Sequence, residues 1–210
     1  MKRFLTLAMV FTLSLSALAQ QKGSVALNAY GGYNFRDRVN FDGFYGYIDE
    51  AFQYGGGLEY YLHSTKSLEL KYLRMDTRMP LYGPAGSKLN DDAEDGSISY
   101  ILVGGNNYFG KSSTAKAMAF AGGDLGVGIV NMDKGGSATK FAWDAKVGVR
   151  INTSSAISLK FHAYVQSIIA AVGSDFYYTW TGVVIGVPDY ASIFQFGLGG
   201  AICFNFKSKK

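Results

Sequence analysis

Residues 141–151 of this chain, FAWDAKVGVRI, alternate between apolar positions and positions that hold small or charged residues. Successive side chains of a β-strand point to opposite faces, so this spacing places the aromatic and aliphatic side chains on one face and Asp144, Lys146 and Arg150 on the other. One face of such a strand requires an apolar environment, and the other requires water or ion partners. Strands of this kind are typical of a transmembrane β-barrel, in which lipid surrounds the wall.

The N-terminal residues predict export. Lys2 and Arg3 form a short basic segment, residues 4–15 are apolar, and residues 17–19, Ala-Leu-Ala, provide the small residues that a signal peptidase accepts. The apolar segment is about a dozen residues long, short of the ~20 that a membrane-spanning helix needs. We therefore expect residues 1–19 to be a signal peptide and residues 20–210 to form an outer-membrane β-barrel domain.

Residues 20–210 fit one domain, since barrels of this length are usually single units. They retain 18 basic and 16 acidic residues, a formal net charge of +2 that is too mild to indicate a nucleic-acid partner. The chain has 27 Gly against 3 Pro, with 15 Tyr and 15 Phe, a balance typical of bent sheets at an interface. The single cysteine, Cys203, forms no internal disulfide, so stability should come from closure of the sheet.

The two-faced alternation recurs and predicts eight strands, at residues 24–36, 52–62, 67–77, 97–109, 116–130, 141–151, 156–167 and 192–206. In the strand at 97–109, the face assigned to the outside carries Ile98, Tyr100, Leu102 and Tyr108. Longer connections at 37–51, 78–96, 131–140 and 168–191 alternate with short turns at 63–66, 110–115 and 152–155. Outer-membrane barrels show this asymmetry, with short turns in the periplasm, where both termini would also lie, and long loops outside.

The continuous apolar face decides between two eight-stranded barrels. A soluble lipocalin-like barrel encloses an apolar ligand and has a wet outer surface. Here the opposite face carries charges of both signs, and a Lys or Arg facing lipid at mid-membrane would cost ~2–4 kcal/mol. The sequence therefore predicts an all-β fold, an eight-stranded antiparallel up-and-down transmembrane β-barrel with short periplasmic turns and longer extracellular loops. Its lumen-facing residues are Glu59, Glu69, Lys71, Asp124, Asp144, Lys146, Arg150, Lys160 and His162.

Ions removed from bulk water must be paired, and an eight-stranded barrel is just wide enough for its side chains to fill it. We therefore expect the lumen charges to form a structural network that joins the walls and blocks a wide pore. Glycines on the same face, at positions 122, 126, 128, 197 and 199, would leave gaps. A narrow pocket or path near residues 116–130 and 192–206 is therefore an open alternative.

Aromatic side chains of the outer face gather toward the strand ends, which predicts two girdles at the membrane interfaces. The girdle on the long-loop side would contain Tyr33, Phe35, Phe52, Tyr54, Tyr72, Tyr100, Phe141, Trp143, Phe194 and Phe196, and the girdle on the turn side Tyr60, Tyr108, Phe204 and Phe206.

With its signal peptide, its two-faced strands and the glycine- and aromatic-rich final strand at residues 196–206, the chain resembles the small outer-membrane β-barrel proteins related to OmpA and OmpW. The resemblance implies the outer membrane of a Gram-negative bacterium, and recognition of a final aromatic residue by the barrel-assembly machinery. Phe206 fits that role, although residues 207–210 follow it. The OmpW likeness implies a narrow channel or a carrier of small apolar solutes.

Residues 105–112 match the phosphate-loop pattern G-x-x-x-x-G-K-S. A phosphate loop joins a buried parallel strand to a helix N-terminus, whereas this stretch finishes one amphipathic strand and precedes another. We interpret it as a periplasmic turn.

Residues 90–96 are rich in carboxylates, but Ala93 occupies a position where a calcium loop needs an oxygen ligand. A solvated acidic loop is favoured there, and contact with divalent ions that bridge lipopolysaccharide is an alternative.

His162 is the single histidine within the predicted strands, and His63 falls in a turn. A lipid-modifying enzyme would need a histidine with a serine and a carboxylate near the lipid-accessible face, whereas His162 has lumen parity. The sequence thus predicts no catalytic activity, no cofactor and no metal site.

The fourth long loop is the strongest candidate for a surface recognition site. Its aromatic residues, Phe176, Tyr177, Tyr178 and Trp180, are too apolar for an idle solvated loop, although a lid over the lumen is an equal alternative. For the whole protein, we expect a structural or surface-recognition role with a largely plugged lumen. The expected partners are outer-membrane lipids, lipopolysaccharide and an extracellular ligand or envelope protein. The alternatives are a narrow channel or carrier and, more distantly, a soluble ligand-binding barrel.

Overall fold

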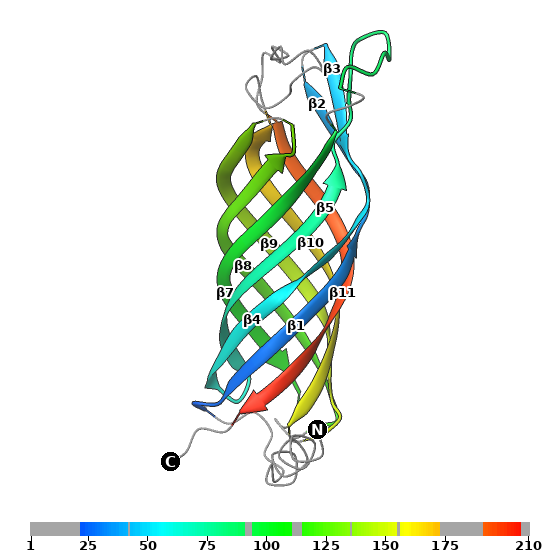
Figure 1. The fold of residues 1–210 in the computed structure, drawn as a ribbon. Coiled ribbons are helices and arrows are strands. Elements are labelled where there is room, and N and C mark those ends of the chain that lie inside the picture. The colour runs from blue at the N-terminus through cyan, green and yellow to red at the C-terminus, as the bar shows by residue number, and fades with distance from the viewer. Residues whose placement is uncertain are drawn as a thin grey trace, which may run out of the picture.

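A computed structural model describes residues 22–41, 43–90, 94–110, 115–134, 136–154, 156–172 and 191–206. In this part of the chain, eight long antiparallel strands close into a barrel (Figure 1), which confirms the predicted fold class. The strands are β1 (Val25–Asn34), β4 (Ala51–His63), β5 (Lys66–Arg78), β7 (Asp95–Phe109), β8 (Ala117–Met132), β9 (Ser137–Asn152), β10 (Ile157–Val172) and β11 (Ala191–Phe206). The predicted signal peptide lies outside the described residues. No described helix is long and apolar enough to span a membrane.

Neighbouring barrel strands follow one another along the chain, and the circle closes where β1 pairs with β11. In this seam Val25 lies opposite Phe206, and the pairing continues to Asn34 opposite Gly197. The start of β1 and the end of β11 therefore lie at the same end of the barrel (Figure 1). The short β4–β5 turn is at this end too, as expected for an up-and-down barrel whose tight turns share one rim.

Several strands run further than the sequence predicted. β9 begins at Ser137 and β10 continues to Val172, so both enter segments that were predicted to be long loops. Ser137 pairs with Asn131 of β8, and the ladder continues without a break toward the barrel. In the added part of β9, residues 137–140, the alternation is weak because only small and polar side chains are present, whereas in the added part of β10 Ile168 is buried in the barrel.

The predicted loops at 37–51 and 78–96 contain a second, three-stranded sheet formed by β2 (Asp37–Phe41), β3 (Phe44–Ile48) and β6 (Leu81–Tyr82). β2 and β3 stand beyond the barrel rim at the end opposite the seam's start (Figure 1). One face of this sheet buries Val39, Ile48 and Leu81. These residues pack in the same apolar cluster as Met75 and Ile98 inside the barrel mouth, so the sheet covers that end of the lumen.

The outer wall of the barrel is apolar, and the predicted orientation is confirmed for every strand except residues 97–109. There, Ile98, Tyr100, Leu102 and Tyr108 are buried inside the barrel. Ile101, Val103 and Phe109 instead face outward, with 44%, 56% and 54% of their surface exposed. Register shows why: Val103 lies opposite Leu70 of the outer face, and Leu102 lies opposite Lys71 of the inner face.

Tyr100 and Tyr108 therefore do not belong to the aromatic girdles. The other predicted girdle residues lie on the outer wall, and on the loop side they contact one another. Phe35 stacks on Phe196 with ring centroids 5.6 Å apart, and Tyr33 meets Phe52 edge-on at 6.4 Å. A band of aromatic residues thus marks this rim of the apolar wall, as at a membrane interface.

The lipid-facing wall predicts a position-dependent response to charge. Val147 is 61% exposed in the middle of β9. Because an Arg at mid-membrane must be desolvated, Val147→Arg should lower the free energy of unfolding from lipid vesicles by ~2–4 kcal/mol. Ser137→Arg, at the exposed end of the same strand, serves as the control and should cost less than about 1 kcal/mol. Urea titration of the protein folded in vesicles measures both, and equal losses would contradict a lipid-facing β9.

Candidate functional site: the barrel interior

The middle of the lumen contains a cluster of buried ion pairs, here called the ionic core. Lys160 Nζ lies 2.7 Å from Glu59, and Lys146 Nζ lies 2.6 Å from Asp124 and 3.2 Å from Glu69. Lys71 Nζ lies 2.8 Å from Asp124 and also pairs with Asp144. The seven residues of the ionic core, Glu59, Glu69, Lys71, Asp124, Asp144, Lys146 and Lys160, are all buried.

Like charges sit side by side within each wall of the barrel. Glu59 lies directly opposite Glu69 on the β4–β5 ladder, and Asp124 lies opposite Asp144 on the β8–β9 ladder. Like charges in such positions repel each other. Lysines compensate both carboxylate pairs. Lys160 of β10 reaches Glu59 and Lys146 of β9 reaches Glu69 from other parts of the barrel, while Asp124 is paired with Lys71 of β5 and with Lys146 of the neighbouring strand. The core is stable only when the walls face each other across a closed lumen.

Neutral donors complete the core. Asn106 Nδ2 donates to Glu59 Oε1 and to Glu69 Oε2, each at 3.1 Å, and so links the two carboxylates. The Tyr108 and Ser67 hydroxyl groups also donate to Glu59. Buried ions remain tolerable only when such hydrogen bonds satisfy their remaining lone pairs.

Arg150 closes the lumen toward the seam's start. Its guanidinium group donates to Ser158 Oγ at 2.7 Å and to Asn205 Oδ1 at 2.8 Å, and also bonds the Tyr61 hydroxyl. It stands 5.5 Å from the ring centroids of both Tyr61 and Tyr108, a cation–π arrangement. With the three lysines of the ionic core, Arg150 brings the buried cations to the same number as the four carboxylates.

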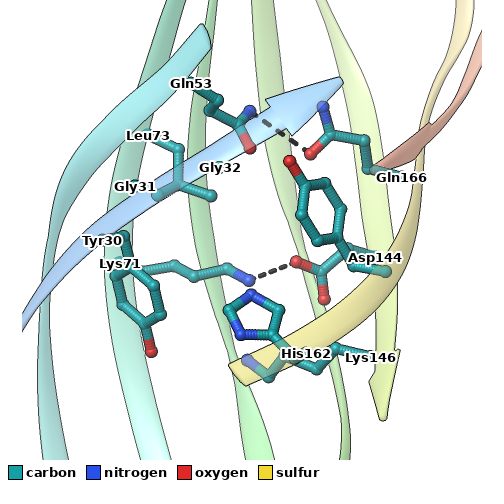
Figure 2. A pocket seen from close by; sticks show the side chains of 11 residues that line it. Tyr30, Gly31, Gly32, Gln53, Lys71, Leu73, Asp144, Lys146, His162 and Gln166 are labelled. Atoms are coloured by element: carbon teal, nitrogen blue, oxygen red, sulfur yellow. Dashed lines mark hydrogen bonds and ion pairs between the residues drawn. The ribbon is translucent and has the colours of Figure 1, made fainter. Parts of the chain in front are cut away.

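His162 lies in the lumen, as its parity predicted. Its ring is in edge or tilted contact with Tyr30, Phe120 and Tyr164, at centroid distances of 6.1, 6.2 and 5.5 Å. Figure 2 shows it beside the ion pair of Lys71 and Asp144. Its Nδ1 atom makes no hydrogen bond to the described residues, so no described serine or carboxylate is bonded to this nitrogen. His63 lies in the exposed β4–β5 turn, close to Ser64 and Thr65.

Above the ionic core lies a belt of buried amides, which the sequence reading did not single out. Gln166 Nε2 lies 3.3 Å from both Asn34 Oδ1 and Gln195 Oε1, and it meets Gln53 at 3.3 Å through its oxygen (Figure 2). The Tyr164 hydroxyl donates to Asn34 at 3.0 Å. An uncharged amide can serve on a wet surface as well as inside a barrel, so its sequence position alone did not reveal this role.

The end of the lumen toward the long loops is apolar, here called the apolar cap. None of the nine residues predicted to face the lumen belongs to it. The cap's buried residues inside the barrel include Leu73, Met75, Ile98, Tyr100, Leu102, Val130, Met132, Ala142, Ile168 and Ile193. The three-stranded sheet covers it with Val39, Ile48 and Leu81. From one end to the other, the described lumen thus contains an arginine–aromatic layer, an ionic layer, an amide belt and an apolar layer.

A small cavity lies between the ionic core and the amide belt (Figure 2). Its lining includes Tyr30, Gln53, Lys71, Asp144 and His162, and it leaves about 20 Å³ for solvent. This is room for roughly one water molecule, because a single water needs about 10–15 Å³ on this measure. A chain of solutes does not fit in it.

The glycine gaps expected on β8 and β11 are filled by neighbouring side chains. An ideal Cβ on Gly197 would lie 2.3 Å from Tyr164 Cζ, and one on Gly128 would lie 2.4 Å from Ile168 Cδ1. These two glycines therefore accommodate large side chains that project into the lumen.

The phosphate-loop match and the acidic segment lie at the ends of barrel strands and in their connections. In the phosphate-loop match, residues 105–109 form the end of β7 and residues 111–112 lie outside the described part, while β8 begins at Ala117, so the described residues place no helix after the match. In the acidic segment, Asn90 is buried and bonds backbone groups of Met79 and Leu81, while Glu94 pairs with Lys88 at 2.6 Å. Residues 91–93 of that segment lie outside the described part. The described residues contain no cluster of metal-ligating side chains.

The aromatic residues predicted to form a recognition loop, Phe176, Tyr177, Tyr178 and Trp180, lie outside the described residues, as do residues 207–210. Their roles stay predictions.

No protein-family model matches the sequence and no curated protein matches it significantly, but solved structures share its fold. The outer membrane protein OprG from Pseudomonas aeruginosa is similar with a TM-score of 0.59 and 10% identity, over 92% of this chain and 100% of that chain. Neisserial surface protein A (NspA) is similar with a TM-score of 0.54 and 12% identity, over 86% and 97%. At such identities the likeness is one of fold. The chain has the fold of a small eight-stranded transmembrane β-barrel of the outer-membrane type.

The ionic core predicts a large effect of breaking one pair and a smaller effect of removing both charges. Lys160→Met leaves the Glu59 carboxylate buried without its cation and should lower the free energy of unfolding by ~3–5 kcal/mol. The double variant Glu59→Gln, Lys160→Met should recover more than half of that loss. Urea unfolding in vesicles measures both. Lys66→Met, an exposed lysine, is the control, and a Lys160→Met loss no larger than the control's would contradict the pairing.

The packing of Tyr164 gives a test with a matched glycine. Gly197→Ala would force the Tyr164 ring away from its amide partner and should cost ~1–3 kcal/mol through overpacking. A Cβ on Gly31 of β1 would have no atom within 4 Å, so Gly31→Ala should be neutral or slightly stabilising. If both variants unfold at the same urea concentration as the parent protein, the ring does not occupy the space over Gly197.

Proposed function

We propose that this protein is a closed outer-membrane β-barrel of a Gram-negative bacterium, with a structural or surface-recognition role and no catalytic activity. Residues 20–210 form the barrel domain, exported by a signal peptide at residues 1–19. Its surroundings are outer-membrane lipids and lipopolysaccharide, and it is assembled by the barrel-assembly machinery.

The observation that carries the closed lumen is the succession of filled layers along it. Four buried carboxylates are balanced by three lysines and Arg150 in the middle of the lumen and toward the seam's start, and the apolar cap fills the end toward the long loops. An ion that moved through the cap would lose its water without gaining a partner, which costs several kcal/mol. The small cavity between the layers leaves about 20 Å³ for solvent, room for roughly one water molecule, which is too little to hydrate a passing ion.

The surface-recognition part of the proposal rests on the three-stranded sheet. A barrel that only spans the membrane needs no ordered structure beyond its rim, whereas this chain uses residues 37–48 and 81–82 to build one. Loops held by a rigid scaffold are where binding functions concentrate.

Conductance separates the closed barrel from the narrow channel or carrier. The protein refolded in detergent, with folding verified by a heat-dependent gel shift, should give no discrete current steps in a planar bilayer, while a general porin inserted in the same bilayer does. Reproducible steps would overturn the closed-lumen proposal. Faster uptake of a small apolar solute by vesicles containing the protein, without current, would favour the carrier.

A further inference from the structure

The exposed face of the three-stranded sheet carries a ladder of arginine and tyrosine side chains. The guanidinium carbon of Arg36 lies 4.1 Å from the centroid of the Tyr47 ring, and that of Arg38 lies 4.7 Å from the Tyr45 ring. Tyr45 stacks in turn on Tyr82 of the next strand, with centroids 5.2 Å apart and ring planes at 10°. Two guanidinium groups are thus held against a row of rings, which limits their freedom before any ligand binds.

Arg38 differs from the other arginines near this rim. Arg36 pairs with Asp49 at 2.9 Å, and Arg78 pairs with Asp49 and Glu94. Among the described residues, Arg38 has no carboxylate partner: its Nε donates to Asn40 Oδ1 at 3.0 Å, and its two Nη groups donate to none of the described side chains. The Arg38 side chain is exposed, so among the described residues its two Nη groups are left for a ligand.

The distance of the ladder from the membrane interface indicates which anion it binds. Phe35 stacks on Phe196 in the aromatic band at the membrane interface, and Arg36 is the next residue. The Asp37 carboxylate accepts a hydrogen bond from the Phe194 backbone at 2.8 Å, which ties β2 to the rim of β11. At about 3.3 Å per residue, Arg38 stands no more than roughly 10 Å beyond Phe35. This is the level of lipid headgroups, since the polar zone adds about 5–8 Å to each side of the hydrocarbon.

We propose that Arg38, with Arg36 beside it, binds a phosphate group of a phosphorylated glycolipid headgroup in the outer leaflet. A guanidinium fork matches two phosphate oxygens with charge-assisted hydrogen bonds, and the stacked tyrosines hold the fork in place. The inference rests on the proposed function, because it requires the sheet to lie at the outer face of the membrane.

Binding of a bisphosphorylated glucosamine disaccharide lipid (lipid A) tests the site. The protein in detergent is titrated with lipid A and with its dephosphorylated analogue, and the dissociation constants are compared. The parent protein should prefer the phosphorylated lipid, and Arg38→Gln should weaken that binding about tenfold. Tyr45→Leu should have part of the same effect, because it removes the ring that supports Arg38.

Arg74→Gln is the matched control. Arg74 is a half-exposed arginine of β5 whose fork is already occupied by Asp76, at 2.7 and 3.1 Å. Its loss removes the same charge and should change the dissociation constant less than twofold. All variants must show the heat-dependent gel shift of the folded barrel, which separates lost binding from lost folding.

Equal affinity for the two lipids, or an equal loss in Arg38→Gln and Arg74→Gln, would overturn the proposal. So would stronger binding of a soluble sulfated polysaccharide such as heparin than of lipid A, because the ligand would then come from outside the membrane. Current steps in the planar bilayer would contradict the closed lumen alone and leave this site untouched, so the two failures are distinguishable.

Discussion

The structure depends on compensating like charges that the sheet places next to each other. Glu59 beside Glu69 and Asp124 beside Asp144 would repel within an isolated hairpin, and Lys160 lies opposite Arg150 in the same way. Only closure of the barrel brings cations to carboxylates across the lumen. One pair, Lys146 with Asp124, lies within the β8–β9 hairpin, whereas the other ion pairs join strands that are not neighbours and favour the one arrangement in which opposite walls meet. This fits the view that buried ion pairs select a structure more than they stabilise it.

The sequence predicted the wall of the barrel better than its contents. Alternation identified the outer face of β9 because charges mark its inner face, and it did the same for β5 and β10. It failed on β7, where Ile98, Tyr100 and Leu102 face an apolar interior while Ile101 and Val103 face lipid. When a strand has apolar residues on both faces, alternation does not show which face points into the barrel. Its orientation comes from the neighbouring strands, through register that no short sequence window contains.

The sequence showed which charged residues face the lumen, but not which of them pair with each other. Each charged residue of the lumen could be recognised by its parity, but Glu59 and its partner Lys160 are separated by most of the barrel in sequence. The amide belt was missed because Gln and Asn are as common on wet surfaces as inside, and the apolar cap because its residues resemble a lipid-facing wall. The small sheet of β2, β3 and β6 was hidden because β6 has two residues, too few for any periodicity.

The seam between β1 and β11 has a consequence for the order in which the barrel is built. None of the seven residues of the ionic core lies on either strand, and glycines meet across the seam, Gly31 opposite Gly200 and Gly32 opposite Gly199. The two strands that are farthest apart along the chain can thus join last, with no charged side chain to be moved past them. Closure of the circle then brings small residues together along the middle of the seam. It also brings Lys160 of β10 to Glu59 of β4 on the other side of the seam, so the slow, long-range step of folding is the step that completes the charge balance.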